Sequence, residues 1–223
     1  MPRIKLSQRS LPNYSKGEEI MNMVTHIVGG SIGILVLLIC VYQAYTNQNI
    51  LDMVSALIYG CSMVALYTVS SVYHGLHAGT GKKVMQIIDH CTIYFLIAGT
   101  YTPILLSAFI AKYPLIGWSL LIAEWSLCAL AVTLTAIDVH AYRVFSIFCY
   151  IGMGWGIIFF IPQCIDVMSL KGFYLLLAGG IAYTDGAILY GIGAKKRWFH
   201  SVFHIFVVLG SILQFLAISY FIL

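Results

Sequence analysis

Two histidines four residues apart, His200 and His204, begin a long apolar run near the end of the sequence. If that run is a helix, both imidazoles project from the same face, one turn apart. Two nitrogens at this spacing can bind one metal ion, and they can equally belong to two buried histidines with separate hydrogen bonds. The pair alone leaves both interpretations open.

The composition decides what kind of protein carries this pair. Of the 223 residues, 61% are hydrophobic and only 9% are charged. A soluble domain carries roughly 25% charged residues, so the chain belongs to the class of polytopic membrane proteins. The six cysteines lie in or beside apolar runs without metal-ligand spacing, and we interpret them as small hydrophobic residues.

The number of membrane crossings follows from the apolar runs. About 20 apolar residues cross a bilayer as a helix. We therefore predict an all-α membrane protein with seven transmembrane helices in a single domain, residues 1–223, of which 1–20 form a polar tail. The predicted spans are 22–45, 53–75, 86–109, 115–136, 142–163, 172–193 and 199–222.

The basic residues orient these spans. Ten of the twelve Lys and Arg residues fall in the N-terminal tail and the even-numbered connections, and only Lys112 and Lys171 fall on the other side. Cytoplasmic segments are enriched in Lys and Arg, so we predict a cytoplasmic N-terminus and an external C-terminus. The net charge of +4 reflects this topology and attraction to anionic lipid, and it is no sign of nucleic-acid binding.

With this topology, four polar residues share one depth near the cytoplasmic face. His74 ends the second predicted span, Asp89 begins the third, and His200 and His204 begin the seventh. Ionisable groups inside a membrane protein are costly and mark functional sites. Three histidines form a zinc site with an open fourth position, which is the catalytic arrangement. Asp89 would bind the metal or its water, and as a general base it could help that water attack a carbonyl.

Other metals remain open at this point. Two axial haem ligands must approach iron from opposite faces, which a pair on one helix face cannot do. A cross-span pair such as His74 with His204 could bind haem but would leave His200 and Asp89 without a role. Neutral imidazoles with a carboxylate suit zinc and could also admit iron or manganese.

Residues around the predicted site supply possible supporting contacts. Glu19, Asn22 and His26 lie on one stripe of the first span, and we interpret them as a network that closes the cytoplasmic mouth of the bundle rather than as ligands. Ser70 lies one turn before His74 on the same face, where its hydroxyl could orient the metal site or bond a carbonyl of its own helix.

The motifs that contain these residues resemble those of a known family. The segments EEIMNMVTH, SSVYH, IIDH and FHSVFH occur in this order on the first, second, third and seventh predicted spans. Together they resemble the bacterial hemolysin III branch of the progestin and adipoQ receptor family. The resemblance extends from about residue 14 over nearly the whole chain.

The resemblance implies a seven-span fold in the bacterial inner membrane with a cytoplasmic N-terminus. It also implies a zinc ion held by His74, His200 and His204, with Asp89 reached directly or through water. Adiponectin-receptor relatives look like ceramidases, so a hydrolase acting on a lipid amide or ester is expected, with membrane lipids as partners. The chain lacks the long segment with which receptor members meet a protein hormone. A non-enzymatic regulator of membrane state with a structural zinc, or a cytolytic protein, stays an alternative.

Overall fold

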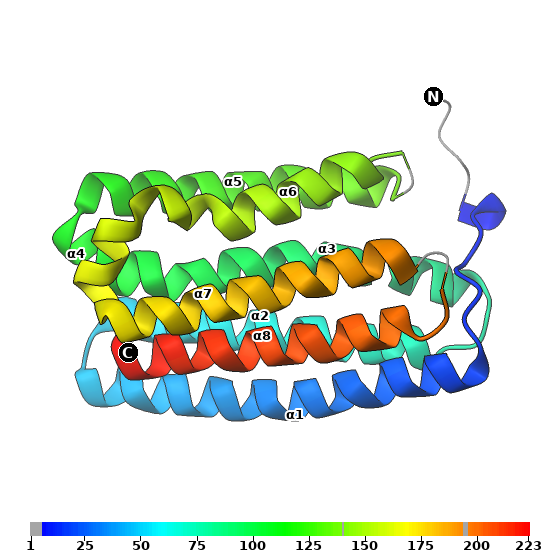
Figure 1. Cartoon of the computed structure of the whole chain (residues 1–223), viewed down its shortest axis with the longest axis horizontal. Helices are drawn as coiled ribbons and strands as arrows, with labels where there is room; N and C mark the ends of the chain where they lie inside the picture. Colours follow the sequence, from blue (N-terminus) through cyan, green and yellow to red (C-terminus); the bar gives the residue numbers. More distant parts are fainter. Residues whose placement is uncertain (1–5, 140, 194–195) are drawn as a thin grey trace.

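In the computed structural model, which describes residues 6–139, 141–193 and 196–223, every regular element is helical (Figure 1). The predicted all-α class is therefore confirmed for these residues. Three of the basic residues counted above, Arg3, Lys5 and Lys195, lie outside them. The elements are η1 (Leu6–Gln8), α1 (Lys16–Asn47), α2 (Ile50–Gly75), α3 (Thr80–Pro103), η2 (Ile104–Phe109), α4 (Ile110–Lys112), α5 (Pro114–Ile137), α6 (Arg143–Trp155), η3 (Gly156–Phe160), α7 (Ile161–Gly193) and α8 (Phe199–Phe221).

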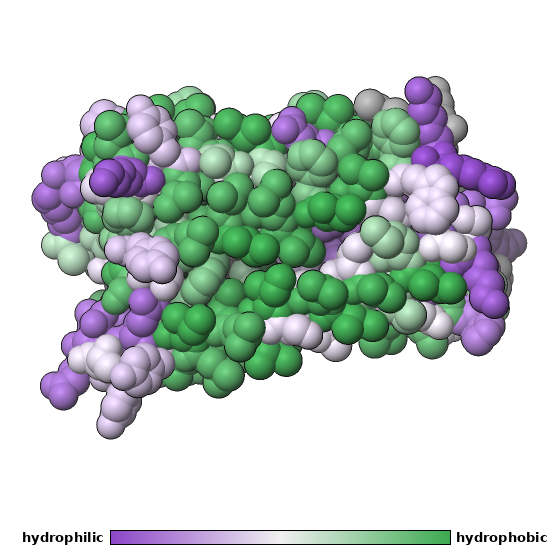
Figure 2. All heavy atoms as spheres, turned by 60° about the horizontal axis from the view of Figure 1, so that its bottom comes forward, coloured by the Kyte–Doolittle hydropathy of each residue, from purple (hydrophilic) through white to green (hydrophobic). Residues whose placement is uncertain are grey.

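The outer surface of the bundle is apolar around its middle. Figure 2 shows a broad hydrophobic band between two hydrophilic ends. Large side chains such as Leu115 and Phe159 are 81% and 82% exposed, an arrangement that lipid stabilises and water does not. Six helical stretches of the described chain are long and apolar enough to cross a membrane: Lys16–Asn47, Ile50–Gly75, Thr80–Lys112, Pro114–Ile137, Arg143–Gly191 and Phe199–Phe221.

This number differs from the seven predicted spans. The predicted spans 142–163 and 172–193 both fall inside the stretch Arg143–Gly191. The helical segments α6, η3 and α7 follow one another directly, and within α7 only Ser169 has non-helical torsions, with a φ of 63°. The sequence pattern located two apolar runs there, and the helix between them is interrupted at Ser169 alone, without a separate connecting loop.

Helix α1 turns a narrow stripe of small and polar residues toward the bundle. Its buried positions recur every three or four residues, and they include Asn22, His26, Gly29 and Gly33. Small residues let neighbouring helices approach closely in a membrane. At the α1–α2 contact, a Cβ added to Gly60 would lie 2.7 Å from the Cα of Leu37. The stripe thus brings the polar residues of α1 against α2 and α8, the two helices it packs on.

The two ends of the bundle differ in what they join. Helices α1 and α8 begin at one end of the bundle, here called the N-terminal end. The last turn of α2 lies at the same end, where Figure 1 shows these elements meeting. At the opposite, C-terminal end, Gln43 donates a hydrogen bond to the carbonyl of Ser219 over 2.9 Å, and Asn47 donates to that of Leu223 over 2.7 Å. Helix α1 and the end of the chain are therefore also joined at the C-terminal end.

Two acidic residues whose roles the sequence left open lie in different surroundings. Glu124 on α5 is buried, and its Oε2 atom has no hydrogen-bond partner among the described residues. Asp185 on α7 is exposed on the surface of the bundle. Only Glu124 thus carries the cost of an unsatisfied carboxyl group inside the protein.

Candidate metal centre

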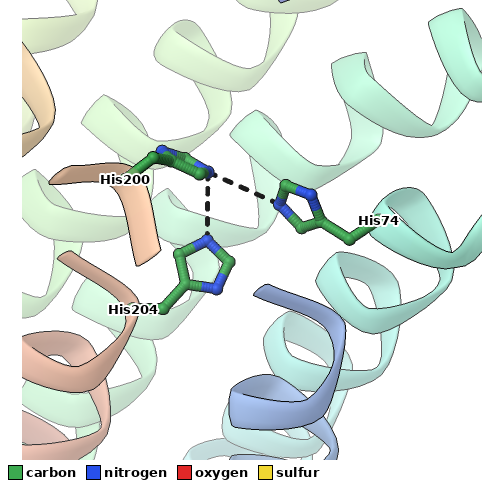
Figure 3. Close-up of side chains that lie close together, drawn as sticks. All are labelled: His74, His200 and His204. Atoms are coloured by element: carbon green, nitrogen blue, oxygen red, sulfur yellow. Dashed lines mark hydrogen bonds between the residues drawn. The ribbon is translucent and has the colours of Figure 1, made fainter. Parts of the chain in front are cut away.

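Three of the four predicted metal ligands meet at the N-terminal end of the bundle. His74 lies in the last turn of α2, and His200 and His204 lie in the first two turns of α8. The Nε2 atom of His200 is 3.4 Å from that of His74 and 3.1 Å from that of His204 (Figure 3). One ligand atom from each residue lies within 4.8 Å of the others, and the three side chains are 3%, 9% and 2% exposed.

Helix α1 orients two of these imidazoles. The Nδ1 atom of His74 is 2.7 Å from Oε2 of Glu19, and Nδ1 of His204 is 3.3 Å from the carbonyl oxygen of Asn22. An ionised carboxylate and a carbonyl only accept hydrogen bonds, so we assign the proton of both rings to Nδ1. Their Nε2 lone pairs are then free and point toward the centre of the cluster.

Lys82 is a functional candidate that the sequence interpretation missed. Its buried Nζ atom donates to Oε1 of Glu19 over 2.7 Å and to the carbonyl of Leu76 over 3.0 Å. Each carboxylate oxygen of Glu19 therefore has one partner, Lys82 or His74. In the sequence, Lys82 served only to orient the predicted spans. It lies eight residues from His74 across a turn, and this separation gave no periodic signal.

The predicted stripe of α1 faces the histidines along its whole length. The Ser201 hydroxyl donates to Oδ1 of Asn22 over 2.6 Å, which ties α8 to α1. His26 stacks on His204 with ring centroids 3.7 Å apart, and both of its ring nitrogens lack a hydrogen-bond partner among the described residues. Glu19, Asn22 and His26 each contact a predicted ligand, and none of them belongs to the cluster of converging ligand atoms.

Asp89 lies beside the cluster but outside it. Ser70, the other predicted supporting residue, lies beside its carboxylate. Asp89 lines a cavity of about 200 Å³ together with Ser70, His200 and His204. The carboxylate thus lies on the wall of the cavity into which two of the histidines also face.

The cavity extends from the histidines into an apolar interior. It is formed by residues of α1, α2, α3, η2, α6, η3, α7 and α8, and beyond Asp89 its walls are mainly aliphatic and aromatic, as at Ile104, Ile157 and Phe173. Cavities that bind small molecules combine apolar walls with a few convergent polar groups. Here the histidines and Asp89 lie at one end, and a few polar side chains such as Thr100 and Gln214 line the deeper part.

The N-terminal tail covers the histidine cluster. Tyr14 stacks on His200, with ring centroids 4.8 Å apart and ring planes at 17°. Burial, and next the repulsion from Tyr190, raises the pKa of the Tyr14 phenol well above its usual range, so its hydroxyl stays neutral. Arg9 donates to the carbonyl of Ile137 over 2.9 Å and so anchors the tail at the end of α5. The sequence had identified this segment only as a polar tail.

Comparison with known proteins finds relatives that match most of the chain. The family model described as haemolysin-III related matches residues 14–215. Hemolysin-3 of Bacillus cereus is 38% identical over 206 residues, which cover 92% of each chain. The Hemolysin-3 homolog of Bacillus subtilis is 36% identical over 204 residues, 92% of this chain and 94% of that one. The human Monocyte to macrophage differentiation factor is 26% identical over 175 residues, 75% of this chain and 70% of that one.

Proposed function

The chain belongs to the haemolysin-III-related family, as its motifs indicated, and we propose that it is a zinc-dependent hydrolase that cleaves an amide or ester bond of a membrane lipid. Its family and its several long apolar helices make it a multi-pass protein of the bacterial inner, or cell, membrane.

One observation carries the zinc proposal, namely the convergence of three buried Nε2 atoms. Two of these rings have their proton on Nδ1, because Glu19 and the Asn22 carbonyl accept it. The Nε2 lone pairs of His74 and His204 are then free to bind a cation that lies among the three rings. The separations of 3.4 and 3.1 Å also fit zinc. Nitrogens on a tetrahedral zinc ion at 2.0–2.1 Å are about 3.3 Å apart.

His74, His200 and His204 would hold the ion, and zinc bound there would supply Lewis-acid activation of water and of the scissile carbonyl. Asp89, beside Ser70, would accept a proton from the attacking water. Because Asp89 lies outside the converging ligand atoms, we favour its contact with the metal through water. The apolar part of the cavity would receive an acyl chain and exclude bulk water from the reacting groups.

We also propose that the chain crosses the membrane seven times, with its N-terminus in the cytoplasm. The stretch Arg143–Gly191 contains 49 residues, and a straight helix of that length would measure about 74 Å. The hydrocarbon core is only about 30 Å thick, so two crossings with a reversal at Ser169 suit it better. Figure 1 agrees, since the chain turns back at the C-terminal end before most of α7 runs beside α8. The excess of Lys and Arg on one side supports the orientation.

The test uses the full chain purified in lipid nanodiscs. Elemental analysis should find about one zinc per chain, and a His200→Ala/His204→Ala variant should lose it, because one imidazole remains. With zinc bound, the protein should release fatty acid from a panel of lipid amides and esters, which mass spectrometry detects. Zinc without any hydrolysis, together with a large loss of thermal stability on metal removal, would favour a structural zinc. Lysis of liposomes by the double variant would favour a cytolytic protein.

A further inference from the structure

The three histidines are not held in the same way. Glu19 holds His74 and the Asn22 carbonyl holds His204, in each case through Nδ1. The Nδ1 atom of His200 has no hydrogen-bond partner among the described residues. In metal sites the second ring nitrogen of a ligand histidine usually donates a hydrogen bond that fixes the ring. His200 must therefore be oriented by another contact.

The tail residue Tyr14 provides that contact. Its ring lies over His200 at 4.8 Å between centroids, with 17° between the planes. The rings of Tyr190 and Phe203 also lie near His200, each with centroids 5.5 Å away, but they are tilted by 54° and 40°. A parallel, offset ring restricts rotation of the plane it stacks on more than tilted neighbours do. Among the described residues, Tyr14 alone stacks on His200.

Tyr14 is itself fixed from both sides. Ser15, which follows it, is the N-cap of α1, and its backbone N–H and hydroxyl both donate to Glu18 over 2.9 and 2.7 Å. Glu18 also accepts a hydrogen bond from the backbone of Trp198, just before α8, over 2.7 Å. On the other side, Arg9 fastens the tail to the end of α5. The ring of Tyr14 is thus placed relative to α8 by the same cap that begins α1.

We propose that Tyr14 is a positioning residue for the metal, and that the face of its ring takes the place of the missing hydrogen bond and keeps Nε2 of His200 aimed at His74 and His204. The inference rests on the proposed zinc site. By this inference the tail, which lies outside the helical bundle, helps to orient a metal ligand. The aromatic face of Tyr14 has this role, and its hydroxyl group does not.

The experiment measures zinc affinity, with a competing chelator, for the full chain in nanodiscs. Tyr14→Leu retains apolar volume but lacks a ring face, and its zinc affinity should fall about tenfold, as when other supporting partners of metal ligands are removed. Tyr14→Phe should stay within about twofold of the unchanged chain, because it retains the ring. Asn13→Ala, an exposed neighbour in the same segment, is the matched control and should have no effect. The absorption spectrum of bound Co²⁺ should change for Tyr14→Leu alone.

Each outcome decides the proposal. An unchanged affinity and Co²⁺ spectrum for Tyr14→Leu would overturn the positioning role while leaving the zinc site intact. An equal loss for Tyr14→Phe and Tyr14→Leu would assign the effect to the hydroxyl group and also overturn it. If Tyr14→Leu lowers the thermal stability of the metal-free protein as much as it lowers affinity, its role is in folding. If the chain without any substitution binds no zinc, the proposed zinc site and this inference are both overturned.

Discussion

The two parts of the cavity differ in how their walls are made. At the N-terminal end of the bundle, polar side chains from α1, α2, α3 and α8 meet, and hydrogen bonds to acceptors on α1 fix the orientation of His74 and His204. Further in, the walls are mainly aliphatic and aromatic, with few polar side chains. A lipid hydrolase needs both: the first part to perform chemistry, and the second to select and hold an acyl chain. Substitutions in the two parts should therefore affect different measurements.

The largest effect is expected at the polar end, for Asp89→Asn. An amide cannot accept the proton of the attacking water, so turnover of the lipid should fall about 10²- to 10⁴-fold, the usual contribution of a general base. Zinc content should not change, because Asp89 lies outside the histidine cluster. Release of fatty acid and elemental analysis on the same sample check both parts. Loss of zinc along with activity would instead make Asp89 a direct ligand.

Glu19→Gln should have the next largest effect. The change removes the negative charge shared by His74 and Lys82, and it weakens the hydrogen bond that orients His74. Zinc affinity should fall about 10- to 100-fold, measured by chelator competition. Asp166→Asn, an exposed carboxylate paired with Lys112, provides the control and should leave affinity unchanged. Equal effects of the two changes would mean that general charge, and not the contact with His74, matters.

The apolar part of the cavity can be narrowed without disturbing the metal centre. Gly180 lines the cavity, and a Cβ added there meets no atom within 4 Å, so Gly180→Leu should place its side chain in the free space. Hydrolysis of long-chain lipids should fall about tenfold relative to short-chain lipids, since a pocket discriminates by 10-fold or more per excess methylene. Gly152→Leu, exposed and equally unobstructed, should leave this ratio unchanged. A uniform loss for all chain lengths would argue against an acyl pocket.

The smallest effect is expected for Glu124→Met. Glu124 is buried with an unpartnered oxygen and does not line the cavity. Replacing it with an apolar side chain of similar shape should raise the free energy of unfolding by about 1 kcal/mol. Zinc affinity and lipid turnover should stay as they are. A rise in melting temperature with unchanged hydrolysis supports this, whereas loss of hydrolysis would give the carboxyl group a catalytic part.

The histidine cluster could be predicted from the sequence because it depends on the periodicity of a helix and on the depth of each residue in the membrane. The spacing of His200 and His204 places both on one helix face, and the span ends give them the depth of His74. Tyr14 and Lys82 could not be predicted in this way. Tyr14 lies in a non-helical segment, and Lys82 lies in the first turn of α3, just after one. The path of such a segment depends on contacts that distant parts of the chain provide, as Ile137 does for Arg9.

The limits of the fold prediction have a similar origin. Where the structure has one long helical stretch, Arg143–Gly191, apolar composition predicted two runs. The change of direction between them depends on the torsion angles of Ser169, which has no glycine or proline neighbour to indicate a break. Hydropathy reports which residues prefer lipid, and it does not report where a helix bends.

The sequence separation between α2 and α8 has a consequence for synthesis. His74 and His200 are 126 residues apart, which a ribosome needs roughly 6–25 s to translate at 5–20 residues per second. During that interval the nascent chain carries only one histidine of the triad, together with Glu19 and Lys82, its partners in the finished structure. A lone imidazole holds zinc weakly, so the proposed zinc ion would be captured only once the late helix has entered the bilayer. Metal loading would then report that assembly is complete.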